Sequence, residues 1–248
     1  MTDSFWILTI LLTVAIFYIY VGWPRISYIE DIYFINLDSD VERRAHMEQQ
    51  LVHAKQTVHR WSATNGANLT TNDMANNNVG EPVYSHRKNW DGTMRNAGVV
   101  GCWLSHVSLF RYLANKPIPD HAAHLILEDD VTVSPAALEP AVLENLPADW
   151  DIVYFGITKP NIESKVSDHI VKLQSHTLYG QGNFGTYGYA VRHGSLHTKI
   201  LPFFTHFTNA IDVQLNQAFD RWNVYAIQPN VVSAESDHQA KSSIDKNV

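Results

Sequence analysis

Residues 124–130 read His-Leu-Ile-Leu-Glu-Asp-Asp, a short apolar run that ends in three consecutive carboxylates. The run at 124–127 has the length and residue types of a buried strand. Three acids directly after it place like charges beside a low-dielectric core, which is unfavourable unless something offsets the charge. A bound divalent cation is a common offset. A solvated strand end that caps the next helix is the alternative, and this stretch by itself leaves both open.

The spacing of the acids fits the cation better. Alternate residues of an extended segment point to the same side, so Glu128 and Asp130 can face one site. Carboxylate oxygens suit Mg²⁺ or Mn²⁺, with the phosphates of a substrate completing the coordination. We therefore predict Glu128 and Asp130 as metal ligands for Mn²⁺ or Mg²⁺.

Strand-like and helix-like segments alternate on both sides of this stretch. The alternation predicts an α/β fold in one domain, with ligands at the carboxyl ends of the strands. A capping box of Ser39 and Glu42 predicts the start of the first helix of this domain. The expected strands are 31–37, 57–63, 124–127, 151–155, 170–173, 186–192 and 224–227, and the expected helices run from 39 to about 54 and over 98–115, 135–145, 195–201 and 211–222.

Composition narrows the class of protein. The chain has 248 residues, of which 45% are hydrophobic and 17% charged, so wholesale disorder is excluded and one large domain is expected. The net charge is −7 and basic residues cluster only in pairs, which argues against a nucleic-acid partner. Cys102 is the single cysteine, so no intrachain disulfide can form, and the compartment stays open.

The N-terminus departs from a plain soluble domain. Residues 5–23 carry no charge and have aromatic side chains at both ends. As a helix they would span roughly 28 Å, close to the hydrocarbon thickness of a bilayer. We predict an uncleaved single-pass membrane anchor over 1–24, followed by the catalytic domain over 25–248. A cleaved signal peptide and a buried core helix are the alternatives, and the few flanking charges leave the orientation open.

Weaker signals surround the triple acid. Residues 98–106 open a helix with two glycines, which could bring backbone amides to a phosphate or could serve helix packing. Residues 180–188 hold four glycines and could approach a sugar or form a flexible turn. Asp212 lies near a helix start, where capping is the simplest role. Residues 64–96 are rich in Asn and Gly, and we expect a long loop that closes over ligands or is a passive insertion.

The order of these features resembles glycosyltransferase family 25, which includes bacterial lipooligosaccharide galactosyltransferases and procollagen galactosyltransferases. The resemblance covers about residues 31–245, and only the serine-rich ending at 242–245 is approximate. The matching stretches are Ile35-Asn36-Leu37 leading to Arg43-Arg44, the Gly-Cys-x-Leu-Ser-His pattern within 98–106, the strand into Glu128-Asp129-Asp130, residues 151–154, Gly185-Thr186-x-x-Tyr189, Ile211-Asp212 and Pro229.

The resemblance implies a single GT-A-type, Rossmann-like domain with a UDP-sugar donor, often UDP-galactose. It also implies Mn²⁺, inversion at the anomeric carbon and an acceptor that is a glycan, glycolipid or protein. Glu128 and Asp130 would bind the metal, Asp129 would reach the ribose or the donor sugar, and Asp212 would be a metal ligand or the general base. Asp212 and Asp129 are thus the candidate catalytic residues, and the candidate nucleotide-sugar-binding residues are Asn36, Arg43, Arg44, Ser105, His106, Gly185 and Thr186.

Proteins of two other classes remain alternatives. A catalytically inactive relative could bind glycans or scaffold a membrane complex, although a scaffold has no need of three acids at a strand end. A metal-dependent phosphoesterase would usually show further His and Asp ligands for a second metal, and the thirteen histidines show no such spacing.

Overall fold

The computed structural model describes residues 28–79, 94–175 and 182–234. Within these ranges the chain forms an eight-stranded mixed sheet in the order β2-β1-β3-β8-β5-β9-β7-β6, and a two-stranded sheet of β10 and β4. The strands are β1 Tyr28–Asn36, β2 Thr57–Ser62, β3 Ala122–Glu128, β4 Val131–Val133, β5 Ile152–Thr158, β6 Ile162–Lys165, β7 Ile170–Leu173, β8 Phe184–Arg192, β9 Val224–Ile227 and β10 Val232–Ala234.

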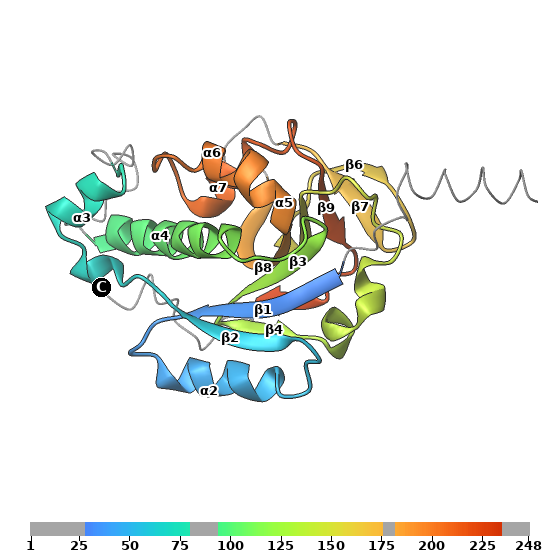
Figure 1. The fold of residues 1–248 in the computed structure, drawn as a ribbon, viewed down its shortest axis with the longest axis horizontal. Coiled ribbons are helices and arrows are strands. Elements are labelled where there is room, and N and C mark those ends of the chain that lie inside the picture. Colours follow the sequence, from blue (N-terminus) through green and yellow to red (C-terminus); the bar gives the residue numbers. More distant parts are fainter. Residues whose placement is uncertain (1–27, 80–93, 176–181, 235–248) are drawn as a thin grey trace, which may run out of the picture.

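Helices cover both faces of the large sheet (Figure 1). Those with α-helical geometry are α2 Val41–Gln50, α3 Thr71–Asn76, α4 Met94–Ala114, α5 His193–Ser195, α6 Leu201–Phe203 and α7 Ile211–Asn216. Shorter turns of other helix types are η1 Gly66–Asn68, η2 Pro135–Leu138, η3 Pro140–Leu143 and the π-helical η4 Leu196–Ile200.

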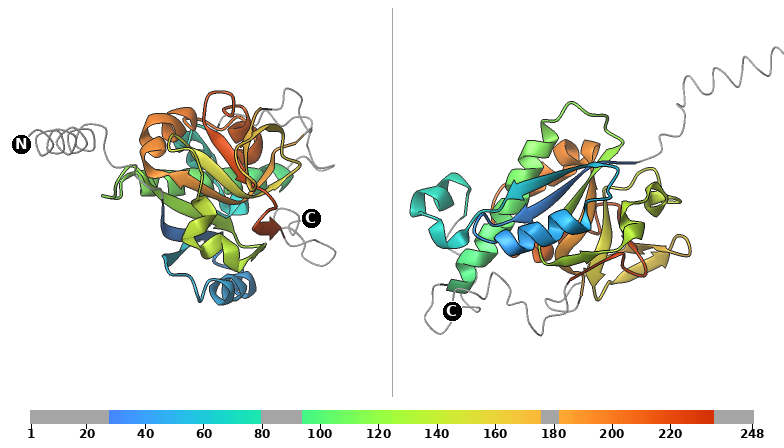
Figure 2. Two further views of the ribbon diagram at one scale, coloured as in Figure 1. Left: turned by 90° about the vertical axis from the view of Figure 1, so that its right-hand side faces the viewer. Right: turned by 90° about the horizontal axis from the view of Figure 1, so that it is seen from below.

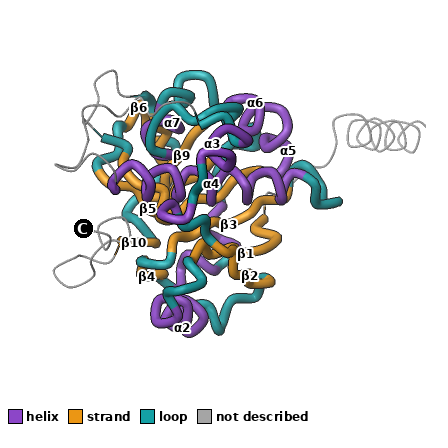
Figure 3. Tube along the Cα trace, turned by 90° about the vertical axis from the view of Figure 1, so that its left-hand side faces the viewer, coloured by secondary structure: helices purple, strands orange, loops and turns teal. Residues whose placement is uncertain are grey.

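Alternating side chains of the central strands build two cores. In β1, Ile32 and Phe34 pack on the α2 side, whereas Tyr33 and Ile35 pack on the α4 side. The long helix α4 lies along its face of the sheet, with Trp103 at 0% exposure in its middle. Views from below and from the side show α2 and α4 on opposite sides of β1 and β2 (Figures 2 and 3). The sheet is therefore the middle layer of three.

Parallel pairing of β1 with β2 and β3 aligns their carboxyl ends. Asn36 is paired with Ser62 of β2, and Ile35 with Glu128 of β3. The loops after these three strands therefore meet at one edge of the sheet. This alignment brings the triple acid next to Asn36, as the predicted α/β fold requires.

The structure corrects several expected elements. The capping box at α2 was wrong, because α2 begins after Asp40 and no side chain caps it. In place of a helix over 135–145 there are two separate 3₁₀ turns, since Pro140 lacks the N–H that a continuous helix would need. The last helix is shorter than expected and ends at Asn216. The strands β4, β6 and β10 were not predicted, because β4 and β10 have only three residues and β6 (Ile-Glu-Ser-Lys) is exposed throughout and has no apolar run.

The expected loop over 64–96 is partly helical. It contains η1 and α3, and Thr70 and Asp73 cap α3 reciprocally. The helix α4 already begins at Met94. Residues 80–93 of this segment lie outside the described part, as do the predicted anchor at 1–24 and the ending at 242–245. Among the described helices, none combines the length and apolar character needed to cross a bilayer.

Candidate active site

A cavity of about 490 Å³ opens at the carboxyl ends of β1, β2 and β3. Its volume falls in the range of roughly 300–1,000 Å³ that is usual for small-molecule sites. Its walls are the turn from β1 into α2, the segment at 63–67 after β2, one side of α4 and the three acids after β3. Residues 64–67 of the expected loop thus border the cavity. The acids that the sequence singled out form one wall of it.

Asn36 and Arg43 hold Asp129 in place. The Asn36 amide Nδ2 donates to Asp129 Oδ2 at 2.7 Å and to the Asp40 carbonyl at 3.0 Å. Arg43 Nη1 donates to Asp129 Oδ1 at 3.0 Å and lies 3.4 Å from Asp130 Oδ2. Both carboxylate oxygens of Asp129 are therefore engaged by protein donors. Burial nevertheless raises the pKa of Asp129, and Asn36 and Arg43 offset only part of that rise.

Arg60 of β2 is a member of this network that sequence reasoning missed. Its Nε donates to Asn36 Oδ1 at 2.9 Å, its Nη2 donates to the Asn36 carbonyl at 3.1 Å, and it also pairs with Asp38. These contacts fix which way the Asn36 amide points, with Nδ2 toward Asp129. The alternation of β2 places Arg60 and Trp61 on opposite faces of the sheet, but nothing in the sequence alone links Arg60 to Asn36.

Glu128 ends β3 and is supported from two elements. Thr186 Oγ1 of β8 donates to Glu128 Oε1 at 2.7 Å, and His106 Nε2 of α4 lies 3.4 Å from the same oxygen. Burial by itself raises the pKa of Glu128, but the His106 imidazole and the Thr186 hydroxyl outweigh it, and the pKa lies below its ordinary value. Glu128 is therefore a carboxylate at neutral pH and is held in a fixed orientation.

Asp130 has too little positive charge around it. Burial and the neighbouring Glu128 raise the pKa of Asp130 to about 6, and Arg43 offsets only part of that rise. A carboxylate in this position gains from an additional cation. Glu128 and Asp130 both line the cavity, and both offer the oxygen donors that Mg²⁺ and Mn²⁺ prefer. The donor set thus fits the divalent ion expected from the sequence.

Asp212, in the first turn of α7, is a further acid near Glu128. Its Oδ2 accepts from the Gly185 amide at 3.1 Å, and its Oδ1 accepts from the Val213 amide at 2.8 Å. Gly185 precedes Thr186, so one short piece of β8 joins Asp212 to Glu128. Burial raises the pKa of Asp212, with Glu128 contributing. Asp212 is not among the residues that line the 490 Å³ cavity.

Gly185 needs to be a glycine. Its φ is +90°, a conformation that side chains disfavour, and an added Cβ would lie 2.5 Å from the Tyr187 ring. Its amide could not otherwise turn toward Asp212. In the glycine-rich stretch 180–188, the close approach at Gly185 is therefore between its backbone amide and the Asp212 carboxylate.

Ser105 and Gly101 attach α4 to the segment after β2. Ser105 Oγ donates to the Gly101 carbonyl at 2.7 Å and accepts from the Thr64 amide at 2.8 Å. A Cβ at Gly101 would lie 2.6 Å from the Thr64 carbonyl oxygen. Gly101 therefore serves packing of the helix against this segment, which was one of the two expected roles for the glycines of 98–106.

The two arginines of α2 have different surroundings. Arg43 faces the acids, with its side chain 12% exposed. Arg44 is 48% exposed and pairs with Glu48 one turn along the same helix. Neighbouring residues of a helix point about 100° apart, so only one of the two can face the cavity. The structure places Arg43 against Asp129 and Asp130, which line the cavity.

Comparison with known proteins identifies the family of the chain. The family model described as glycosyltransferase family 25 (LPS biosynthesis protein) matches residues 29–197, more than half of the chain. The "Glycosyltransferase 25 family member" of Drosophila melanogaster is 26% identical over 172 residues, which are 66% of this chain and 26% of that protein. "Procollagen galactosyltransferase 2" of Homo sapiens is 22% identical over 167 residues, covering 65% of this chain and 26% of that one.

A third relative carries a different kind of name. The "Probable inactive glycosyltransferase 25 family member 3" of Rattus norvegicus is 24% identical over 145 residues, which are 56% of this chain and 24% of that protein. The chain thus spans about a quarter of the length of these curated relatives. Among solved structures, the inositol-1-phosphate CTP transferase from T. maritima matches with a TM-score of 0.34 and 11% identity, over 80% of this chain and 66% of that one. That similarity is too low to inform the fold.

Proposed function

The chain belongs to glycosyltransferase family 25, and we propose that it transfers galactose from UDP-galactose to a hydroxyl of a glycan, glycolipid or protein acceptor. The observation that carries the proposal is the triple acid at the end of β3, which lines a cavity of about 490 Å³. The choice of galactose rests on the human relative, whose name is procollagen galactosyltransferase 2.

Glu128 and Asp130 would hold a Mn²⁺ or Mg²⁺ ion against the donor diphosphate. Bound there, the ion would act as a Lewis acid that offsets the charge developing on the departing UDP. Asn36 and Arg43 would act on the nucleotide side of the site by holding Asp129 in place. The remaining residues proposed for the donor site would act by positioning other groups. Ser105 positions α4, His106 and Thr186 position Glu128, and Gly185 positions Asp212.

Asp129 and Asp212 differ in how free they are to accept a proton. Both oxygens of Asp129 accept strong side-chain hydrogen bonds, one of them from an arginine. The oxygens of Asp212 accept only backbone amides in the contacts described above, and burial raises its pKa. Burial raises the pKa of both aspartates, so their partners make the difference, and a carboxylate that no arginine holds is the better proton acceptor. We therefore assign Asp212 as the general base and Asp129 as a positioning residue for the donor.

An inverting displacement requires the acceptor hydroxyl on the side of the sugar opposite the diphosphate. Asp212 does not line the cavity and is joined to Glu128 through Gly185 and Thr186, so as general base it would meet the acceptor and not the nucleotide. Asp212 would take the hydroxyl proton as the oxygen–carbon bond forms and the bond to UDP breaks.

A donor screen tests this function. Purified full chain should release UDP from UDP-galactose faster than from other UDP-sugars, and addition of the true acceptor should raise the rate. The inactive alternative predicts binding of UDP-galactose without release or transfer from any donor. That outcome would overturn the proposed activity and leave a binding protein of the same family.

We also propose that residues 1–24 anchor the domain to a membrane as a single helix. Support comes from the uncharged run at 5–23 and its aromatic ends. Deletion of 1–24 should give a protein that no longer sediments with membranes and still uses a soluble acceptor. A deleted protein that is folded but inactive would show that the segment does more than tether.

A further inference from the structure

Cys102, His106 and Glu128 come together at the cavity from two elements, α4 and β3. Cys102 and His106 are one helical turn apart on α4, so they share a face of that helix, and Glu128 ends the strand beneath it. One ligand atom from each lies within 4.8 Å of the others. All three line the cavity, so a small ion can reach them. The proposed transfer reaction gives the thiol no role, and it gives His106 only the positioning of Glu128.

His106 supplies the observation that points to a ligand. Its side chain is 1% exposed, and Nε2 makes no hydrogen bond within the described part of the chain. The nearby Oε1 of Glu128 is 3.4 Å away. A buried ring nitrogen without a hydrogen bond is costly, and a cation between the two atoms would satisfy it.

The distances suit tetrahedral zinc. Metal bonds of roughly 2.0–2.1 Å to nitrogen and oxygen put these two ligand atoms about 3.3 Å apart. The observed separation of His106 Nε2 and Glu128 Oε1 is 3.4 Å. A zinc–sulfur bond of about 2.3 Å puts sulfur about 3.6 Å from either atom. The Cys102 sulfur lies within 4.8 Å of both other ligand atoms. To reach about 3.6 Å, each of these distances has to shorten by at most about 1.2 Å, which a change in the Cys102 side-chain torsion can cover.

Hydrogen bonds from Tyr189 and Thr186 orient His106 and Glu128. His106 Nδ1 lies 2.7 Å from the hydroxyl of Tyr189, which is itself fully buried. With the proton on Nδ1, the ring donates to Tyr189 and leaves Nε2 as an acceptor for metal. Thr186 donates to Glu128 Oε1 in the same way. Such outer partners are typical of metal-binding histidines and carboxylates.

We infer that Cys102, His106 and Glu128 form a site for a zinc-type divalent cation, distinct from the oxygen site of Glu128 and Asp130. Thiolate and imidazole select Zn²⁺ and Co²⁺ over Mn²⁺ and Mg²⁺. Three protein ligands leave a fourth position open toward the cavity. The two sites share Glu128 but differ in their other ligands. This inference goes beyond the proposed function and does not depend on it.

Cobalt titration of the metal-free full chain tests the site without an activity assay. Co²⁺ should bind with a thiolate-to-cobalt charge-transfer band and the intense visible bands of tetrahedral geometry, and one equivalent of Zn²⁺ should remove both. Cys102 is the single cysteine, so the charge-transfer band of the unaltered protein identifies the sulfur ligand by itself. Co²⁺ binding without that band would overturn the site.

Variants separate the three ligands. Cys102→Ser should abolish the charge-transfer band, and His106→Gln should weaken Co²⁺ binding at least tenfold. Tyr189→Phe removes an outer partner and should weaken binding by about tenfold. Asp130→Asn belongs to the other site and should keep the band, as should His53→Gln, a control in the exposed turn after α2. A band that is unchanged by His106→Gln, or lost in Asp130→Asn, would contradict the assignment.

Discussion

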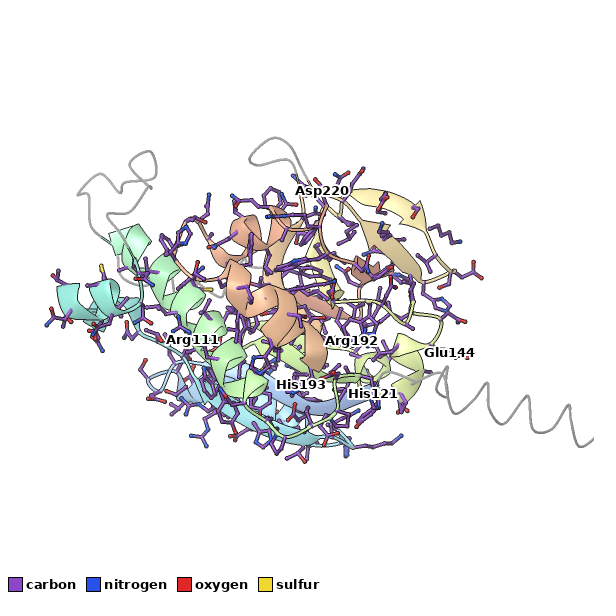
Figure 4. All side chains as sticks on the ribbon, turned by 45° about the horizontal axis from the view of Figure 1, so that its top comes forward. Arg111, His121, Glu144, Arg192, His193 and Asp220 are labelled. Atoms are coloured by element: carbon purple, nitrogen blue, oxygen red, sulfur yellow. The ribbon has the colours of Figure 1, made fainter. Side chains whose placement is uncertain are left out.

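The two ends of the β1–β3 pair carry buried acids with opposite surroundings. At the amino-terminal end, Asp31 of β1 is 2% exposed and bonds to His124 Nδ1 of β3 at 2.5 Å and to Lys116. His193, which is labelled in Figure 4, has its Nδ1 3.2 Å from His124 Nε2. At the carboxyl end, Asp129 and Asp130 share ion pairs with Arg43, and His106 Nε2 lies 3.4 Å from Glu128 Oε1. One end is compensated and the other has an excess of acid.

The pKa values of the two ends differ accordingly. Burial raises the pKa of Asp31, but hydrogen bonds from His124 and Lys116 outweigh it and the pKa is lowered. Burial and Glu128 raise the pKa of Asp130 to about 6. A compensated buried acid stabilises the fold, whereas an uncompensated one costs stability and is kept where a ligand supplies the missing charge. The comparison therefore separates a structural cluster from a binding site within one sheet.

The largest expected effect on stability comes from Asp31→Asn. The change leaves Lys116 and His124 without their carboxylate and should lower the free energy of unfolding by about 3 kcal/mol. Denaturant unfolding would measure it. UDP release per folded molecule should not change, because the cluster lies at the far end of the strands. If the variant were as stable as the unaltered protein, the claim that the Asp31 cluster stabilises the fold would be wrong.

Lowering the pH should reduce the stability that the cluster of Asp31, His124 and His193 contributes to the fold. The lowered pKa of Asp31 means that its stabilisation is complete above the ordinary aspartate pKa and is lost as pH falls through the folded value. Burial and His124 lower the pKa of His193, so its neutral form is favoured in the fold and protonation is destabilising as pH falls below the ordinary histidine range. The contributions of Asp31 and His193 should therefore be lost toward acid pH, whereas the raised pKa of Asp130 acts in the opposite direction between about pH 6 and the ordinary aspartate range, and thermal melts would measure the sum. Asp31→Asn should flatten the more acidic part of this decrease, and an unaltered slope would count against the assignment.

Asp130→Asn should shift stability in the other direction. Removing one of several crowded carboxylates should raise the free energy of unfolding of the metal-free protein by about 1 kcal/mol at pH 7. Mn²⁺ should stabilise the unaltered protein and stabilise this variant much less. Melting with chelator and then with Mn²⁺ would measure both changes. A loss of stability in chelator would mean that Asp130 is already compensated by the protein.

The smallest effects distinguish the two arginines of α2. Arg44→Gln removes an exposed pair with Glu48 and should change stability by less than about 0.5 kcal/mol, with transfer unaltered. Arg43→Gln releases Asp129 and Asp130 and should impair transfer clearly. Equal losses of transfer in both variants would show that Arg44 also reaches the donor. The pair serves as a matched control because the residues are adjacent and chemically identical.

The sequence predicted the parts of the site that depend on local pattern. The strand into Glu128-Asp129-Asp130 was visible because an apolar run stops abruptly at acids, and the alternation of strands and helices placed it at a carboxyl end. Contacts between distant segments were not visible in this way. Arg60 orients Asn36 across β2 and β1, and Tyr189 orients His106 from β8, but both depend on strand order. The antiparallel placement of β8 between β3 and β5 has no local signature.

Steady-state transfer in Mn²⁺ and in chelator, for the unaltered chain and for Asp130→Asn, tests the central claim most directly. The account predicts that chelation abolishes transfer from UDP-galactose and that Mn²⁺ restores it. Asp130→Asn, measured in Mn²⁺, should be folded and should lose at least about 100-fold in turnover, which is about 2.7 kcal/mol of transition-state stabilisation. Undiminished transfer in chelator, or by Asp130→Asn, would contradict the claim that the uncompensated acids are the metal-binding part of the active site.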